Sequence, residues 1–221
     1  MLVIFDLDDT LIETSKCLTT HYLHIAFVAM QSAGLEVEEN AFDELLSINE
    51  KELSSRFALK KFYNNYSDQI RIYEAGFAAL KTPLPEEISL EIVPGALEVL
   101  DELQTAHTLA LVTAGDSNLQ RQKLEKAGIQ PERFSKLVIG KGLSKKLDYQ
   151  RVLSELNVHP QEVLVCGDRV PIDLTPAKQL GLCTVHFRNG RGLVHDEPKA
   201  DVDFTIHTLK QLNEVFAKHE S

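Results

Sequence analysis

Long apolar runs are absent from this sequence of 221 residues. The first apolar run, "LVIF" at 2–5, stops at Asp6 and is too short for a signal peptide. No other apolar run approaches the length of a membrane span. Cysteine is scarce as well: Cys17, Cys166 and Cys183 have neither a metal-binding nor a paired spacing. A sparse and odd set of cysteines fits a reducing compartment better than a disulfide framework. We therefore expect a cytoplasmic protein with no membrane segment.

Clusters of basic residues are absent too. The 23 Lys and Arg residues are outnumbered by 33 Asp and Glu residues, which gives a formal net charge of -10. We therefore expect neither a nucleic-acid backbone nor an anionic membrane to be the main partner. The hydrophobic share of 43% is ordinary for a globular protein, and the length suits one domain or a core with a smaller inserted one. The oligomeric state is not readable from these features.

Short apolar runs have the pattern of strands that are buried on both faces of a sheet. They lie at 2–5, 108–113, 137–139, 163–166 and 183–187, with a weaker one at 203–206. From about residue 90 onward, helical patterns with recognisable ends lie between the runs. This alternation predicts crossover units and a parallel sheet covered on both faces. The predicted fold class is therefore α/β, with a doubly wound parallel sheet.

Residues 14–89 have a different pattern, with apolar residues at helical spacing and no convincing strand. One apolar helical face is formed by Tyr22, Ile25, Ala26, Ala29 and Met30. Asn49 with Glu52 resembles a capping box that opens the third of four helices. The segment "TPLPEE" at 82–87 has the composition of a linker. The predicted domains are 1–13 with 90–221 for the α/β core, and 14–89 for an all-helical insert.

Acidic residues follow two of the predicted strands. Asp6 and Asp8 come directly after the first strand, and Asp168 follows the strand at 163–166, with Asp173 a few residues further on. Because ligands bind beyond the carboxyl ends of parallel strands, these side chains should converge at one edge of the sheet. Two unit charges ~4 Å apart repel by roughly 4 kcal/mol at an effective dielectric near 20. Converging carboxylates therefore favour a hard divalent cation with oxygen ligands, usually Mg²⁺.

A hydroxyl and a lysine are expected at the same edge. The strand at 108–113 ends in Thr113, and Lys145 and Lys146 precede the helix predicted after the third strand. Acids, a hydroxyl and a lysine from four separate segments would then face one ligand.

Four segments carry a resemblance to a known family. "DLDDT", "LVTAG", a lysine before "LD", and "GDRVPID" are similar, in this order, to the four motifs of the haloacid dehalogenase-like (HAD) hydrolase superfamily. The resemblance covers roughly 1–13 and 90–187. The helical segment lies where capped members carry their cap, between the first motif and the second strand. The resemblance implies a Rossmann-like core with an inserted helical cap, and the activity of a phosphatase.

The resemblance also implies roles for the acidic residues. Asp6 would be the nucleophile that takes the phosphoryl group as an aspartyl-phosphate. Asp8 would protonate the leaving oxygen and then activate the water that hydrolyses the intermediate. Its backbone carbonyl, with the carboxylates of Asp6 and Asp168, would hold Mg²⁺, and Asp173 would support that metal site.

Thr113 and nearby backbone N–H groups would bind the phosphoryl oxygens, and Lys146, from its position before "LD", would balance the charge on Asp6. Leu147 stands where the motif usually has proline, so Lys145 remains an alternative. Further departures from the family pattern lie at Asp9, Ala114, Arg169 and Ile172. Four other side chains, those of His21, His24, Arg188 and Arg191, could reach a substrate, but a solvated surface is the expected place for them.

The expected function is a Mg²⁺-dependent phosphatase that hydrolyses a small phosphorylated metabolite. A sugar-phosphate mutase of the same superfamily is the main alternative, because it shares both aspartates and a similar cap. A phospho-accepting receiver or a non-catalytic binding protein is a further alternative, although a receiver has no helical insert after its first strand. The sequence does not name the substrate.

Overall fold

A parallel sheet forms the centre of the larger of two units in the computed structural model, which describes residues 1–142, 144–194 and 199–219. Its six strands have the spatial order β3-β2-β1-β4-β5-β6, and every neighbouring pair is parallel. The strands are β1 (Leu2–Phe5), β2 (Thr108–Ala114), β3 (Lys136–Gly140), β4 (Val163–Gly167), β5 (Cys183–Phe187) and β6 (Phe204–Ile206). The predicted α/β fold with a parallel sheet is confirmed.

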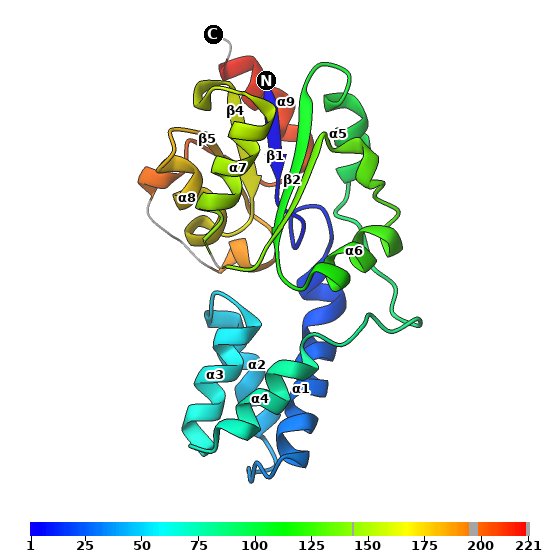
Figure 1. The fold of residues 1–221 in the computed structure, drawn as a ribbon, viewed down its shortest axis with the longest axis vertical. Helices are drawn as coiled ribbons and strands as arrows, with labels where there is room; N and C mark the ends of the chain where they lie inside the picture. Colours follow the sequence, from blue (N-terminus) through cyan, green and yellow to red (C-terminus); the bar gives the residue numbers. More distant parts are fainter. Residues whose placement is uncertain (143, 195–198, 220–221) are drawn as a thin grey trace. The chain divides into compact units, whose positions relative to one another are not determined.

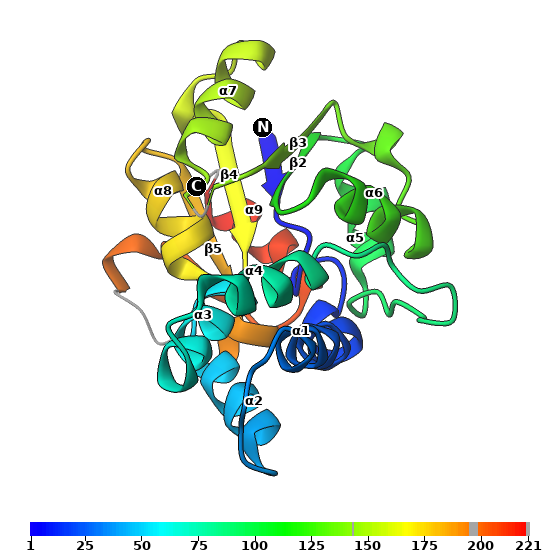
Figure 2. The same cartoon turned by 60° about the horizontal axis from the view of Figure 1, so that its bottom comes forward.

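Helices cover both faces of this sheet. Helices α5 and α6 lie on one side, and α7 and α8 lie on the other (Figures 1 and 2). The helices of this unit are α5 (Ala96–Leu103), α6 (Ser117–Lys126), α7 (Lys146–Leu156), α8 (Thr175–Lys178) and α9 (Leu212–His219). Because the chain starts with the central strand and returns to both sides of it, strand order reverses between β1 and β4, where ligands bind in such folds.

The strand β1 is buried on both faces, which explains its unbroken apolar sequence. Leu2 and Ile4 belong to one core cluster with Tyr149 and Val152 of α7. The alternate residues of a strand point to the opposite face. Full burial of each such side chain stabilises the fold by about 1.5–3 kcal/mol, so the sheet holds the residue that follows β1, Asp6, on a rigid base.

Contacts divide the chain into two compact units, Met1–Thr14 with Leu90–Ser221, and Ser15–Ser89. The second unit is helical, with α1 (Thr20–Ser32), α2 (Ala41–Lys51), α3 (Ser55–Tyr66) and α4 (Ile70–Ala79). Its core includes Leu23, Phe27, Met30, Leu59 and Phe62. Gly76 permits the close approach of α4 to α1, because a Cβ there would lie 2.6 Å from Cγ of Met30.

One prediction about the helical unit is wrong. Asn49 does not open the third helix, because it lies inside α2 and is buried. The third helix begins after Ser54, whose hydroxyl accepts a hydrogen bond from the backbone N–H of Phe57 at 3.3 Å. Serine at this position caps the helix in the way that was assigned to Asn49.

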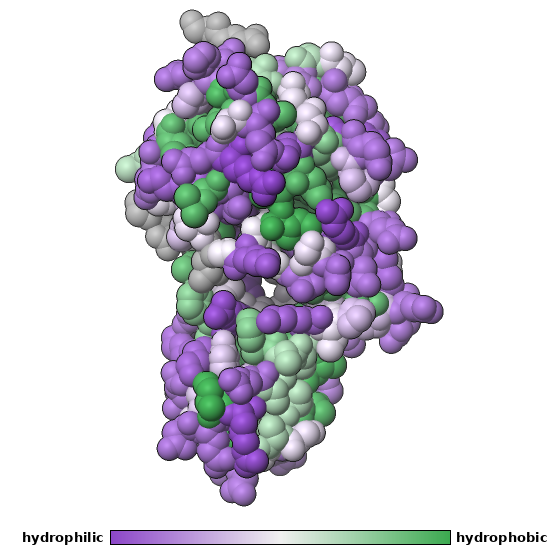
Figure 3. Space-filling model, in the orientation of Figure 1, coloured by the Kyte–Doolittle hydropathy of each residue, from purple (hydrophilic) through white to green (hydrophobic). Residues whose placement is uncertain are grey.

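The visible face is mostly hydrophilic, with smaller hydrophobic patches (Figure 3). None of the described helices is both long enough and apolar enough to cross a membrane.

Candidate active site

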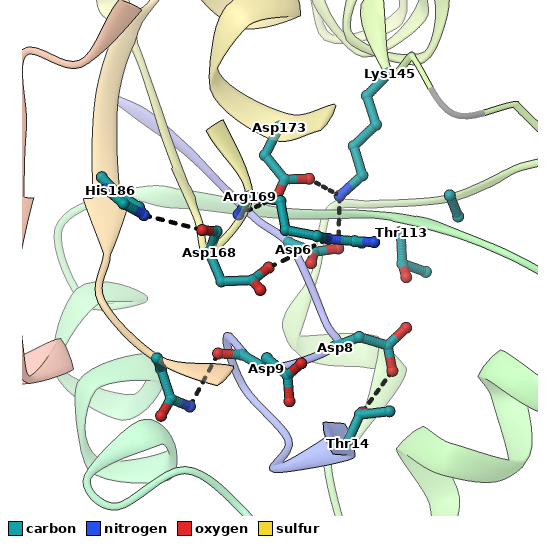
Figure 4. Close-up of polar contacts among 12 residues, drawn as sticks. Asp6, Asp8, Asp9, Thr14, Thr113, Lys145, Asp168, Arg169, Asp173 and His186 are labelled. Carbon is teal, nitrogen blue, oxygen red and sulfur yellow. Dashed lines mark hydrogen bonds and ion pairs between the residues drawn. The ribbon is translucent and has the colours of Figure 1, made fainter. Parts of the chain in front are cut away.

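The candidate site lies where β1 and β4 end side by side. Phe5 is in register with Cys166, and the backbone N–H of Asp6 donates to the carbonyl of Cys166 at 3.0 Å. Asp6 and Asp168 therefore leave the sheet from neighbouring strands at the same edge, as expected from the sequence (Figure 4). Both side chains are buried.

Three carboxylates form a buried cluster at this edge. Oxygen atoms of Asp6, Asp168 and Asp173 all lie within 4.8 Å of one another. Gly167 makes room for the cluster, because a Cβ at this position would lie 2.6 Å from the Cβ of Asp173. Asp173 is held in place, since its Oδ2 accepts a hydrogen bond from the backbone N–H of Arg169 at 2.9 Å.

Lys145 is the lysine that contacts this cluster. Its Nζ lies 2.5 Å from Oδ1 of Asp6 and 2.6 Å from Oδ1 of Asp173 (Figure 4). The selection of Lys146 from the sequence is therefore corrected: Nζ of Lys146 donates to Oε1 of Gln179 at 3.0 Å in an exposed position. Helical periodicity explains the difference, because Lys145 stands one turn before the buried Tyr149, whereas Lys146 starts α7 about 100° further round.

Burial and charge oppose each other in this cluster. Burial raises the pKa of Asp6, and Lys145 counteracts part of that rise. Burial also holds the pKa of Asp168 well above its ordinary value, with Arg169 as the main opposing charge. The pKa of Lys145 is raised because the charges of Asp173 and Asp6 outweigh the effect of burial. The three carboxylates of the cluster therefore carry more negative charge than Lys145 alone neutralises when all of them are ionised.

Asp8 lies beside the cluster and has cationic and neutral hydrogen-bond donors of its own. Its Oδ1 accepts hydrogen bonds from Nζ of Lys123 and from Oγ1 of Thr14, both at 2.6 Å. Its Oδ2 accepts one from Nε2 of Gln120 at 2.8 Å. Burial acts to raise the pKa of Asp8, but Lys123 and these hydrogen bonds outweigh it, so the pKa lies below its usual range.

Thr113 lies in the last part of β2 and is fully buried. Its Oγ1 accepts a hydrogen bond from Nε2 of Gln120 at 2.6 Å, so the same amide group contacts Thr113 and Asp8. The structure thus brings the predicted hydroxyl next to the predicted acids. Gln120 and Lys123 were not singled out from the sequence. Helical spacing could have indicated them. Leu124 in α6 and Ala127 directly after it are buried, and positions 120 and 123 lie on the same helical face.

His186 in β5 and Asn189 in the loop after it support the two acid-bearing loops, a role that the sequence did not reveal. Nε2 of His186 lies 3.0 Å from the carbonyl oxygen of Asp168, which accepts, so the proton belongs on Nε2. Nδ2 of Asn189 donates to the carbonyl oxygen of Asp9 at 3.0 Å. Asp9 has a φ of +58°, and this left-handed conformation is one that aspartate tolerates better than most residues.

Arginines and histidines named from the sequence have varied positions. Nε of Arg169 lies 3.6 Å from Oδ1 of Asp168. Burial and the charge of Arg169 lower the pKa of Arg191 to about 10, with Asp9 among the opposing charges. Nη2 of Arg188 donates to the carbonyl oxygen of Leu193 at 3.2 Å, within its own loop.

Two further residues, His21 and His24, make edge-on ring contacts to Tyr22 and Phe42 inside the helical unit.

A buried carboxylate triad, a lysine in contact with it and a hydroxyl thus lie at the carboxyl edge of the parallel sheet. The family model for haloacid dehalogenase-like hydrolases matches residues 3–187, and the chain belongs to this family. Within it, the chain is a phosphatase that acts on phosphoric monoesters.

A phosphatase is similar to this chain in sequence, and two solved structures are similar to it in fold. A glyceraldehyde 3-phosphate phosphatase of Pyrococcus furiosus is 30% identical over 236 residues, which cover 98% of this chain and 92% of that protein. A predicted phosphoglycolate phosphatase from Haemophilus somnus has a similar fold, with a TM-score of 0.73, 16% identity and 97% of each chain covered. The HAD-hydrolase YfnB from Bacillus subtilis, solved bound to magnesium, has a TM-score of 0.65, 17% identity and the same coverage of 97% for each chain.

Proposed function

We propose that this chain is a Mg²⁺-dependent phosphatase that cleaves a small phosphorylated metabolite through a phosphoryl group carried on Asp6. The observation that carries the proposal is the buried cluster of Asp6, Asp168 and Asp173, with Lys145 against it. Buried carboxylates without enough compensating charge are costly, so a cluster of this kind is retained where it binds a cation.

The residues of the cluster fit Mg²⁺. All the ligand atoms are oxygens, which hard divalent cations prefer. Oδ2 of Asp6 and Oδ2 of Asp168 are buried and have no hydrogen-bond donor among the residues that the structure describes. These two carboxylates and the backbone carbonyl of Asp8 would hold the ion. Asp173, which contacts Lys145 and the backbone N–H of Arg169, would position the residues around it. When bound, Mg²⁺ offsets negative charge on the nucleophile and on the transferring phosphoryl group.

The first step would use both aspartates of the β1 loop. A carboxylate oxygen of Asp6 forms a bond to phosphorus as the bond from phosphorus to the ester oxygen breaks. The electron pair of that bond goes to the leaving oxygen, which takes a proton from the protonated form of Asp8, the minor form at neutral pH while its donors hold the pKa of Asp8 low. The products are an alcohol and an acyl phosphate on Asp6. Lys145 stabilises the charge on Asp6, and the Thr113 hydroxyl donates to a phosphoryl oxygen.

The second step would restore the enzyme. Asp8, now ionised, takes a proton from a water molecule, and the water oxygen forms a bond to phosphorus. The bond between phosphorus and Asp6 breaks, so inorganic phosphate leaves and Asp6 is again a carboxylate. Asp8 is then protonated for the next turnover. Because the same group donates and accepts, its position relative to Asp6 governs both steps.

We propose a three-carbon phosphorylated aldehyde, acid or alcohol as the substrate. Support comes from the glyceraldehyde 3-phosphate phosphatases, whose similarity extends over nearly the whole chain, including the helical unit. The helical unit, 15–89, would act as the cap that closes the site and selects the leaving group.

The test is phosphate release from a panel of phosphomonoesters. Glyceraldehyde 3-phosphate, glycerol phosphate, phosphoglycolate and hexose phosphates are compared in Mg²⁺, in EDTA, and with the Asp6→Asn variant. The proposal predicts repeated turnover that both controls abolish, with the highest kcat/KM for a three-carbon ester. A single labelling event without turnover would favour a receiver. Interconversion of sugar phosphates without phosphate release would favour a mutase.

A further inference from the structure

Helix α6 presents two polar side chains on its buried face. Asp116 caps this helix, since its Oδ1 accepts from the backbone N–H groups of Asn118 at 3.0 Å and Leu119 at 3.1 Å. The cap fixes where the helix begins, so Gln120 and Lys123 fall one turn apart on the face that packs inward. A buried lysine and a buried amide are retained only with good partners, and both find one in Asp8.

The donors around Asp8 fill most of its hydrogen-bonding capacity. Lys123 and Thr14 donate to Oδ1, and Gln120 donates to Oδ2. A carboxylate has about four acceptor positions, two on each oxygen. Among the described residues, three of these positions are taken, and the remaining one lies on Oδ2. The side chain of Asp8 is still 18% exposed, whereas that of Lys123 is 8% exposed, so this position has access to solvent or to a ligand.

The amide of Gln120 has one chemically sensible orientation. An ionised carboxylate only accepts hydrogen bonds, so the nitrogen and not the oxygen of the amide must face Asp8. The same nitrogen donates to Oγ1 of Thr113. Because Thr113 accepts this bond, its own hydroxyl hydrogen is left to donate elsewhere. The amide therefore orients Asp8 and Thr113 together.

We propose that Gln120 and Lys123 are positioning residues for Asp8, and that they leave the open acceptor position on Oδ2 as the place where the proton is exchanged. This inference rests on the proposed function, in which Asp8 gives a proton to the leaving oxygen and later takes one from water. In the first step the proton leaves Oδ2 as the ester bond breaks, and in the second it returns to Oδ2 from water. Gln120 and Lys123 act through Asp8 in this scheme, and neither contacts the phosphoryl group or the leaving oxygen.

The nature of the leaving group gives a test that separates positioning from a general structural role. An alkyl ester needs a proton on its leaving oxygen, whereas 4-nitrophenol leaves readily as an anion. The phosphorylation step is measured in single turnovers with Mg²⁺, by rapid quench for an alkyl ester from the panel and by nitrophenolate release for 4-nitrophenyl phosphate. The variants are Lys123→Met and Gln120→Leu, which keep most of the side-chain volume. Lys126→Met, at an exposed position of the same helix, removes the same charge and is the matched control.

The expected result is a change in the ratio of the two rates. Misplacing a general acid costs part of its usual 10²–10⁴-fold contribution, so the alkyl rate should fall by about tenfold or more in both variants. The aryl rate should fall by less than about threefold, and Lys126→Met should leave the ratio unchanged. In an Asp8→Asn background, adding Lys123→Met should have no further effect on the alkyl rate, because the proton donor is already gone.

Equal losses for both esters, or no loss for either, would overturn the positioning role. Additive effects of Lys123→Met and Asp8→Asn would also overturn it. Melting curves with and without Mg²⁺ identify a variant that does not fold, in which case the Gln120→Leu variant decides. If the wild type releases no phosphate from any ester, the proposed function fails, and this outcome is distinct from an unchanged ratio in an active enzyme.

Discussion

Nζ of Lys145 lies 2.5 Å from Oδ1 of Asp6, and the two side chains are 0% and 1% exposed. A fully buried contact of this kind is unscreened by solvent, so its charge acts on the nucleophile directly. Lys145 also contacts Asp173, which connects the start of α7 to two of the three acids in the cluster. The buried charge of one lysine residue is thus shared between the nucleophile and the loop after β4.

The first prediction concerns the two adjacent lysines. Lys145→Met should lower kcat by about a hundredfold or more, because it removes a preorganised cation from the nucleophile. Lys146→Met should stay within about twofold of the wild type, because its amine lies on the surface. Steady-state phosphate release with saturating Mg²⁺ measures both, and a larger loss in the Lys146 variant would contradict the assignment.

The second prediction concerns the pH dependence of metal binding. Burial raises the pKa of Asp6 to about 6, from an ordinary value of 3.8. A proton on this carboxylate competes with a cation, so Mg²⁺ affinity should be high at about pH 7.5 and fall as the pH drops through about 6. The measurement is the Mg²⁺-induced rise in Tm across this range. A rise that is equal at both ends, or larger at the acidic end, would be inconsistent with Asp6 as a ligand.

The third prediction concerns the cost of the acidic cluster. Burial holds the pKa of Asp168 well above its value in the unfolded chain. Ionisation of this carboxyl group therefore lowers the free energy of unfolding of the metal-free protein at neutral pH, and the loss disappears at a pH below the unfolded pKa. The neutral variant Asp168→Asn should therefore raise the metal-free stability at neutral pH, and the gain should shrink as the pH falls. It should also abolish the Mg²⁺-dependent rise in Tm and the activity. A less stable metal-free variant would refute this account of the cluster.

The fourth prediction concerns the loop after β5. Gly190 has a φ of +47°, and a Cβ there would lie 2.6 Å from Oδ2 of Asp9 and closer still to its Cβ and Cγ. Nδ2 of Asn189 donates a hydrogen bond to the carbonyl oxygen of Asp9, so Asp9 has little room to move away from an added methyl group. Gly190→Ala should therefore lower both the free energy of unfolding and kcat.

Gly181→Ala is the matched control for this loop. Gly181 has a φ of +77° but nothing within 4 Å of an added Cβ, so the substitution carries only the left-handed backbone cost of about 1–2 kcal/mol. The Gly190 variant should lose at least about 1 kcal/mol more, from steric overlap. Chemical denaturation of both variants compares them, and equal losses would show that the Asp9 contact does not matter.

The strands were predictable from sequence because the parallel sheet buries both faces of each one. The run at 2–5 matches β1 (Leu2–Phe5), and the run at 183–187 matches β5 (Cys183–Phe187). The acids of the site were predictable for a related reason, since a charge directly after a buried strand must lie at the sheet edge. The helical unit was predictable as helical, but its caps were not, as Asn49 shows: a buried helical position overrides a local capping pattern.

The lysine and the supporting residues were harder to predict. Choosing between Lys145 and Lys146 requires knowing which turn of α7 faces the site, and a motif spacing that lacks its usual proline does not provide this. Gln120, Lys123, His186 and Asn189 contact residues that are distant in the chain, and such pairings depend on the tertiary fold. A glutamine and a lysine on the buried face of an otherwise ordinary helix are nevertheless a usable signal for future sequences.

The measurement that most directly tests this account is the capture of the phosphoryl group on Asp6. The enzyme is mixed with an excess of its best substrate and Mg²⁺, quenched in acid during turnover, and digested, and the peptides are analysed by mass spectrometry. The account predicts one added phosphoryl group on the peptide that contains Asp6, lost on treatment with hydroxylamine and absent from Asp6→Asn. Continued phosphate release by Asp6→Asn, or a phosphoryl group on a different residue during turnover, would contradict the central claim.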